Sequence, residues 1–123
     1  MTRRATPEQT IHMQVAQYLD AALDPDACWY STVPSGGGGL IRGALLKACG
    51  LKVGIPDIVL IPRGRCACFI ELKAAGGQVR PAQRALHARL RDLGCLVAVC
   101  RSVDEVEGTL KAWMVPTRGR IAA

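Results

Sequence analysis

Hydrophobic and polar residues alternate along this chain with two different periods. Apolar residues recur every three or four positions, as in helices with one buried face, in three stretches: 6–22, 81–93 and 102–113. Short apolar runs, which are typical of buried strands, lie at 58–61, 66–70 and 95–100. A short strand from Cys28 to Val33 and a short helix from Leu40 to Cys49 complete the pattern. The predicted order is helix, strand, helix, strand, strand, helix, strand, helix.

The three longer helices carry start signals and a continuous apolar face. Thr6 with Gln9, and Ser102 with Glu105, have the spacing of capping boxes, and Pro81 suits a first helical turn. The core faces predicted from helical spacing are Ile11, Val15, Leu19 and Ala22 in the first helix, Leu86, Leu90 and Leu93 in the third, and Val103, Val106, Leu110 and Trp113 in the last.

The segment from Asp57 to Lys73 predicts a β-hairpin with charged residues at its open end. Two β-rich runs flank a turn at Gly64, which favours an antiparallel pair of strands. If the turn is centred on Gly64, Asp57 and Glu71 lie opposite each other and share a face. Alternation along the strand adds Lys73 to the same face. The hairpin therefore brings two carboxylates and one ammonium together.

This combination of charges favours a divalent metal site. Charged residues are rarely buried unless they are paired or bind metal, and neighbouring carboxylates repel unless a cation lies between them. Mg²⁺ prefers a few carboxylates with water and substrate phosphate, and such an ion can activate water for hydrolysis. Lys73 is then placed to orient the water or to stabilise developing charge. The alternative is that Glu71 and Lys73 form an exposed pair at a strand end.

The pattern as a whole predicts an α/β fold with a small mixed β-sheet flanked by helices. The hairpin is antiparallel, whereas the run from Lys73 through the third helix to Cys95 is a βαβ unit and should be parallel. The chain has 123 residues, which suits one domain. We expect a core over residues 6–115 and a basic tail at 117–123.

Charge and hydropathy narrow the class of protein. Sixteen Lys and Arg against ten Asp and Glu give a net charge of +6 and a pI near 9.3, which favours a polyanionic partner. No apolar run approaches the roughly 20 residues needed to span a membrane, and the charged N-terminus lacks the apolar core of a signal peptide. Charge alone is about equally consistent with a basic surface that has no nucleic-acid partner, but together with the predicted metal site it favours nucleic acid. We therefore expect a cytoplasmic protein that binds nucleic acid.

The six cysteines do not form a recognisable metal or disulfide pattern. None is part of a Cys-x-x-Cys pair, and His12 and His87 lie away from them in sequence, which argues against structural zinc. Most lie among aliphatic residues and are interpreted as small core residues. Cys66 and Cys68 should face away from Glu71.

Pro56-Asp57 followed by Glu71-Leu72-Lys73 resembles the motif of the PD-(D/E)xK nuclease superfamily. The wider pattern resembles its VRR-Nuc branch, the virus-type replication and repair nucleases, over roughly residues 6–115. The features that match in order are Glu8, the 34–37 Pro-Ser-Gly-Gly loop, Lys47, Gly50 to Asp57, Glu71 to Lys73, Gly76-Gly77, Gln83, Gly94 and the helix from Ser102. This resemblance implies a restriction-endonuclease-like core and a metal-dependent DNA endonuclease.

The resemblance also implies roles for individual residues. Asp57, Glu71 and the backbone carbonyl of Leu72 would hold one or two Mg²⁺ ions, with Mn²⁺ able to substitute, and Glu8 would complete the shell directly or through water. Lys73 would activate water, and Gln83 would assist. Two alternatives stay open: Glu8 as a partner of the helix dipole, and Gln83 as a helix surface residue.

The expected DNA contacts lie on loops and helix surfaces. They are Ser35, Gly36 and Gly37 in a glycine-rich loop, Arg42 and Lys47 in the second helix, and Arg80 and Arg84 at the start of the third. A plain linker is the alternative for the loop, and ordinary solvated charge for Arg42 and Lys47.

Stand-alone members of the branch are similar to Holliday-junction resolvases and often form homodimers, and a small nuclease of this kind suggests phage replication, recombination or repair. Trp29, Tyr30 and Trp113 are candidate interface residues but are equally consistent with a core role. Two other classes remain: a non-catalytic DNA-binding protein with the same fold, and a small redox or zinc-binding protein.

Overall fold

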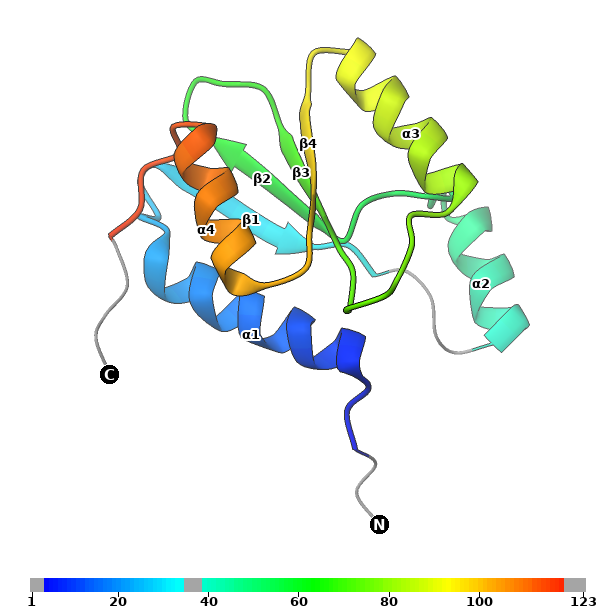
Figure 1. The fold of residues 1–123 in the computed structure, drawn as a ribbon. Coiled ribbons are helices and arrows are strands. Elements are labelled where there is room, and N and C mark those ends of the chain that lie inside the picture. Colours follow the sequence, from blue (N-terminus) through cyan, green and yellow to red (C-terminus); the bar gives the residue numbers. More distant parts are fainter. Residues whose placement is uncertain (1–3, 35–38, 119–123) are drawn as a thin grey trace.

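The computed structural model describes residues 4–34 and 39–118 and contains four helices and four strands in that part of the chain (Figure 1). In chain order the elements are α1 (Pro7–Ala22), β1 (Cys28–Thr32), α2 (Gly39–Ala48), β2 (Ile58–Pro62), β3 (Cys68–Leu72), α3 (Pro81–Asp92), β4 (Leu96–Cys100) and α4 (Val103–Ala112). This order is the predicted one.

The four strands form one mixed sheet in the order β1-β2-β3-β4. The pairs β1–β2 and β2–β3 are antiparallel, and β3–β4 is parallel, which confirms the predicted hairpin and the βαβ unit. In the hairpin Ile58 lies opposite Ile70, and Leu60 lies opposite Cys68. The next pair towards the open end is therefore Asp57 and Glu71, in the register predicted from the turn at Gly64.

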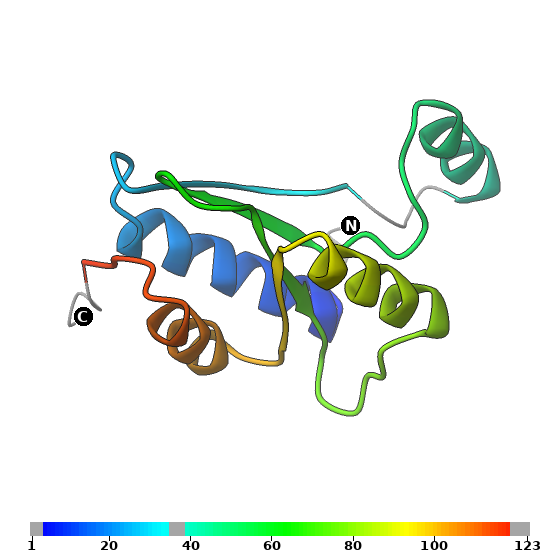
Figure 2. The same ribbon diagram turned by 90° about the horizontal axis from the view of Figure 1, so that it is seen from above.

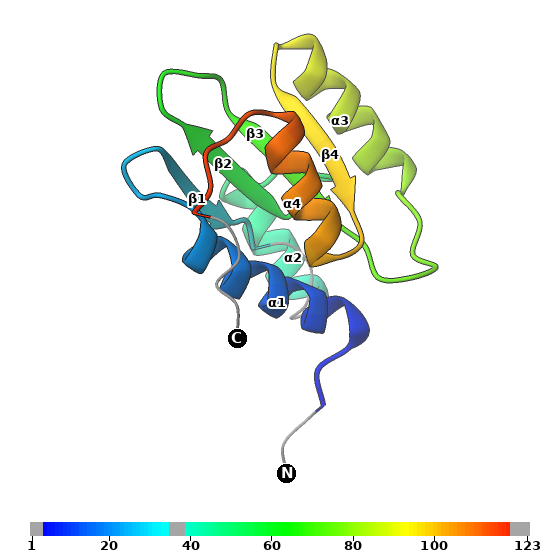
Figure 3. The same cartoon turned by 60° about the vertical axis from the view of Figure 1, so that its left-hand side comes forward.

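Helices α1 and α4 lie side by side over one face of the sheet and enclose the core (Figures 2 and 3). The capping box of Thr6 and Gln9 fixes the start of α1 with two reciprocal hydrogen bonds of 2.9 and 3.1 Å, whereas α4 has only the Ser102 half of its box. The buried core is aliphatic with three cysteines: Val15, Leu19, Leu23, Cys28, Ile58, Leu60, Cys68, Ile70, Leu72, Cys100, Val106, Leu110 and Val115.

Helix α3 joins β3 to β4 and packs beside β4. The predicted core face was wrong at Leu93, which is 59% exposed. The reason is that α3 ends at Asp92, so Leu93 caps the helix and does not continue its buried face. The residue that α3 does bury is His87, with Leu86 and Leu90 half-buried.

Helix α2 stands apart from the rest of the fold (Figure 2). It forms where a short helix was predicted, but none of its residues is buried. Leu40 and Ile41 in its first turn are 94% and 86% exposed. Helix α2 therefore lacks the packing that usually stabilises so short an element, and an isolated helix of ten residues is only marginally stable in water.

The last described residues lie beside the end of α1. Thr117 forms a β-bridge with Leu23, and the Arg118 amide donates to the carbonyl of Ala22, so these two residues of the expected tail lie against the end of α1. Among the described residues, none of the helices is long and apolar enough to cross a membrane.

Candidate active site

The open end of the hairpin holds three charged residues that the fold buries. Asp57, Glu71 and Lys73 are 8%, 2% and 8% exposed. They are therefore not an exposed pair at a strand end. Isolated charges are rarely buried to this extent, so this part of the sheet needs a compensating partner for its carboxylates.

Asp57 is tied to the neighbouring strand by its own side chain. Its Oδ2 accepts a hydrogen bond from the backbone amide of Leu72 at 2.7 Å, and the carbonyl of Asp57 accepts from the amide of Val33 at 2.8 Å. The Asp57 carboxylate is thus held over the end of β3, which places the backbone of Leu72 next to it.

Glu71 is held by one ammonium and one amide. Lys73 Nζ lies 3.5 Å from Glu71 Oε1, and Gln83 Nε2 donates to the same oxygen at 2.7 Å. Gln83 Oε1 in turn accepts from the backbone amide of Arg80 at 2.9 Å. Gln83 is therefore not a helix surface residue: it links the first turn of α3 to Glu71 and orients that carboxylate.

Gly54 determines how closely α3 approaches the site. It has a φ of +89°, and a Cβ at this position would lie 2.5 Å from the carbonyl oxygen of Ala82. Only glycine tolerates both the positive φ and this close approach. The segment before Asp57 therefore packs directly against the first turn of α3, from which the side chain of Gln83 contacts Glu71.

The surroundings of Glu71 make its ionised form less favourable than it is in water. Burial, followed by the negative charge of Asp57, raises the pKa of the Glu71 carboxyl to about 7, against a lowering contribution from Lys73. Its second oxygen, Oε2, is buried without a hydrogen-bond partner. A divalent cation would supply both the missing charge and the missing partner, so the residues present fit a metal ion.

His12 of α1 joins this site, and the sequence analysis did not assign it a role. Its Nε2 lies 3.7 Å from Asp57 Oδ1, and its side chain is 30% exposed. A signal was present in the spacing, because His12 is three residues before the core residue Val15. Glu8, one helical turn earlier, is exposed, and no hydrogen bond or ion pair between described residues joins it to Asp57 or Glu71.

The site is open. No three His, Cys, Asp or Glu residues within the described part of the chain are close enough to form a complete metal cage. This is compatible with Mg²⁺, which commonly keeps several waters and uses only one or two carboxylates plus substrate phosphate.

The segment after Lys73 is fixed by the arginine that directly follows β4. Arg101 Nη1 donates to the carbonyls of Ala74 and Gly77, at 3.0 and 2.6 Å. This arginine therefore stabilises the turn that leads from the site into α3.

The predicted DNA contacts are only partly within the described residues. Arg42, Lys47, Arg80 and Arg84 are exposed, two on α2 and two at the start of α3, whereas Ser35, Gly36 and Gly37 lie outside the described residues. Other arginines bind the protein itself: Arg63 donates to a carbonyl after α1, and Arg65 donates to two carbonyls at the end of α4.

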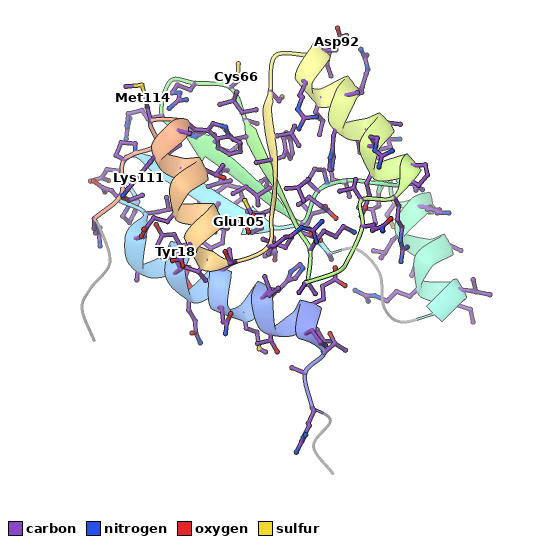
Figure 4. The ribbon with its side chains drawn as sticks, viewed as in Figure 1. Tyr18, Cys66, Asp92, Glu105, Lys111 and Met114 are labelled. Carbon is purple, nitrogen blue, oxygen red and sulfur yellow. The ribbon has the colours of Figure 1, made fainter. Side chains whose placement is uncertain are left out.

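The cysteines differ in position and exposure. Cys66 is in the turn between β2 and β3, at the far end of the hairpin (Figure 4). Cys28, Cys68 and Cys100 are buried, and burial raises the pKa of each of these thiols. Cys49 and Cys66 are exposed and Cys95 is intermediate, so the core interpretation holds for three of the six.

Comparison with known proteins identifies the fold and the family. Two solved structures superpose on this chain, each with 20% sequence identity. One, described as a "VRR_NUC domain protein", has a TM-score of 0.71 and covers 91% of each chain. The other, described as a "VRR_NUC domain", has a TM-score of 0.60 and covers 89% of this chain and 99% of its own. Among curated proteins no match was found.

The sequence itself matches the model of one protein family, the VRR-NUC domain, over residues 32–104. That stretch is more than half of the chain and contains Asp57, Glu71, Lys73 and Gln83. The fold is accordingly of the nuclease type, and the chain belongs to the VRR-NUC domain family.

Proposed function

We propose that this protein is a metal-dependent DNA endonuclease that hydrolyses phosphodiester bonds. The observation that carries the proposal is Glu71 Oε2, a buried oxygen without a partner beside Asp57 and Lys73. Within a nuclease-type domain, this oxygen and its neighbouring carboxylate suit a divalent ion better than a structural ion pair.

The roles follow from the contacts of each residue. Asp57 Oδ1 and Glu71 Oε2 are the carboxylate oxygens left for a metal after the hydrogen bonds to Leu72 and Gln83, and the carbonyl of Leu72 is a third oxygen ligand. Mg²⁺, with Mn²⁺ as a substitute, would activate water and neutralise a phosphate oxygen. Glu8, which is exposed, is assigned a contact through water.

Lys73 and Gln83 act on the geometry of the reaction. The Lys73 ammonium is held beside Glu71, from where it orients the attacking water and stabilises the developing negative charge. Gln83 keeps the Glu71 carboxylate in one orientation through its bond of 2.7 Å. Both side chains depend on the same junction of β3 with α3.

The DNA backbone would follow the basic surface beside this junction. Arg80 and Arg84 flank Gln83 on α3, and Arg42 and Lys47 extend the positive surface along α2. No Asp or Glu occurs between Asp26 and Asp57, so all the charged residues in the α2 region are positive. Such contacts bind phosphate without reading base sequence.

We further propose that two copies act together on a branched substrate such as a four-way junction. The support is the exposed apolar surface of α2, formed by Leu40, Ile41 and Leu45, since a helix without intramolecular packing is stabilised when a second copy covers it. Two sites related by a two-fold axis suit paired cuts in a symmetric junction.

The oligomeric state can be tested by sedimentation equilibrium of wild type and of the Leu40→Ser, Ile41→Ser double variant. Met114→Ser is the matched control, because Met114 is 82% exposed and lies at the end of α4 (Figure 4). A dimer that dissociates in the double variant and persists in the control supports the two-copy arrangement. A monomeric wild type rejects it.

The activity can be tested by cleavage of a labelled four-way junction and a linear duplex of matched sequence, in Mg²⁺, Mn²⁺ or EDTA. Wild type is compared with Lys73→Ala and with Lys111→Ala, which removes the same charge from the exposed end of α4 (Figure 4). We expect metal-dependent paired cuts in the junction that Lys73→Ala reduces by at least about a hundredfold and that Lys111→Ala preserves.

The possible outcomes separate the parts of the proposal. Equal cutting of junction and duplex keeps the nuclease and rejects the preference for branched DNA. Binding without cutting by the folded protein, in either metal, rejects the nuclease in favour of a DNA-binding protein that retains the fold.

A further inference from the structure

The place where α1 meets the site is occupied by a histidine. His12 Nε2 faces Asp57 Oδ1 across 3.7 Å, which is too long for a good hydrogen bond. Asp57 uses its other oxygen for the amide of Leu72. Oδ1 and Nε2 are therefore two potential ligand atoms that lie close together without a good hydrogen bond between them.

The position of His12 is set by a well-packed helix. Val15 and Leu19, on the same side of α1, are fully buried against the sheet, and the capping box of Thr6 fixes the start of the helix. A ligand on such an element is held more precisely than one on a loop. Glu8 is four residues earlier and exposed, so it is less directly aimed at the carboxylates.

The separation of the two atoms is compatible with one shared ion. Two ligand atoms that each lie about 2.1 Å from a metal can be as far as about 4.2 Å apart. Imidazole nitrogen suits transition metals, whereas Mg²⁺ prefers an all-oxygen set.

We propose that His12 Nε2 is the ligand that α1 supplies to the metal site, and that this nitrogen raises the affinity of the site for Mn²⁺ relative to its affinity for Mg²⁺. The inference rests on the proposed metal-dependent function. It assigns to α1 a direct ligand other than the glutamate at its first turn.

Pulsed electron paramagnetic resonance of bound Mn²⁺ tests this without requiring activity. Only two histidines occur in the chain, so protein labelled with ¹⁵N-histidine identifies any imidazole nitrogen coupled to the ion. We expect a histidine coupling in the wild type, its loss in His12→Ala and His12→Gln, and its retention in Glu8→Gln and His87→Gln. The labelled wild type gives an answer even where a variant folds poorly.

Calorimetric titration with each metal provides the second readout. Removing the imidazole nitrogen in His12→Ala or His12→Gln should weaken Mn²⁺ binding by roughly tenfold or more and Mg²⁺ binding by less. The ratio of the Mn²⁺ affinity to the Mg²⁺ affinity should therefore fall. Glu8→Gln should leave that ratio unchanged.

The possible outcomes separate the role of His12 from the metal-dependent function. Mn²⁺ bound without a histidine coupling, or a coupling that disappears in His87→Gln and survives in His12→Ala, overturns the role of His12 and leaves the nuclease intact. An absence of binding by either ion to the folded wild type overturns the metal-dependent function together with this inference.

Discussion

Replacing Glu71 with glutamine should stabilise the metal-free protein and at the same time remove its response to metal. Glutamine has the size of glutamate and keeps an oxygen that can accept from Gln83 Nε2, which now bonds Glu71 Oε1 at 2.7 Å. The substitution therefore removes the ionisable group with little change in packing.

The expected gain follows from the pKa of the buried carboxyl. Raising the pKa of Glu71 from 4.5 to about 7 disfavours the ionised form in the folded state by about 3 kcal/mol relative to the unfolded chain. Because the folded-state pKa lies above the unfolded value, the stability associated with a neutral Glu71 is fully present below pH 4.5. It is lost as the pH rises through 7.

The assay is urea unfolding in EDTA at several pH values between 4.5 and 8.5. The free energy of unfolding of Glu71→Gln minus that of wild type should grow by about 2–3 kcal/mol over this range. With a urea dependence of about 1–3 kcal/mol/M, the midpoints should separate by roughly 1–2 M at the alkaline end. Glu105→Gln is the matched control, because it removes one carboxylate from an exposed position on α4 (Figure 4).

Metal should reverse the order of the two proteins. An ion that binds only the folded wild type stabilises it by about 4.1 kcal/mol at a thousandfold excess over its dissociation constant, which exceeds the expected advantage of the variant, and Glu71→Gln should gain much less. A pH-independent difference between wild type and variant in EDTA would refute the reasoning. It would mean that Lys73 and Gln83 already compensate the Glu71 charge.

Three further predictions concern the surroundings of the site. Gly54→Ala should destabilise the protein by about 1–3 kcal/mol more than Gly50→Ala in urea unfolding, because both have positive φ but only Gly54 approaches the α3 backbone; equal losses would rule out the close approach. Gln83→Ala should weaken Mn²⁺ binding about tenfold in calorimetry, since it frees an oxygen of Glu71; unchanged affinity would remove its orienting role. In thiol labelling of the native protein, the exposed Cys49 and Cys66 should react before the buried cysteines, and simultaneous reaction would contradict the buried assignment.

The fold and the hairpin could be predicted because they depend on local patterns. The spacing of apolar residues and the short apolar runs determine which segments form helices and which form strands. The symmetry of a hairpin about its turn determines which residues face each other. Counting outward from Gly64 therefore placed Asp57 opposite Glu71, in agreement with the observed register.

Contacts that depend on how two elements approach each other could be predicted less well. The bond from Gln83 to Glu71 requires that α3 start directly over Gly54, and that approach reflects the packing of backbone on backbone. In the same way, the apolar residues of α2 predict a helix correctly, but nothing in their spacing shows that the helix would lie away from the core.

The role of α1 is the part of the site that depends most on geometry. The matched family stretch begins at residue 32, so it contains the hairpin residues and Gln83 but not α1. A glutamate in the first turn is the ligand that the family resemblance implies, and carboxylates suit Mg²⁺. The helix, however, is held by Val15 and Leu19, and its packing brings the side chain of His12 to within 3.7 Å of Asp57. If that imidazole binds the ion, the metal preference of the protein is determined by how α1 packs on the sheet, and not by the hairpin motif alone.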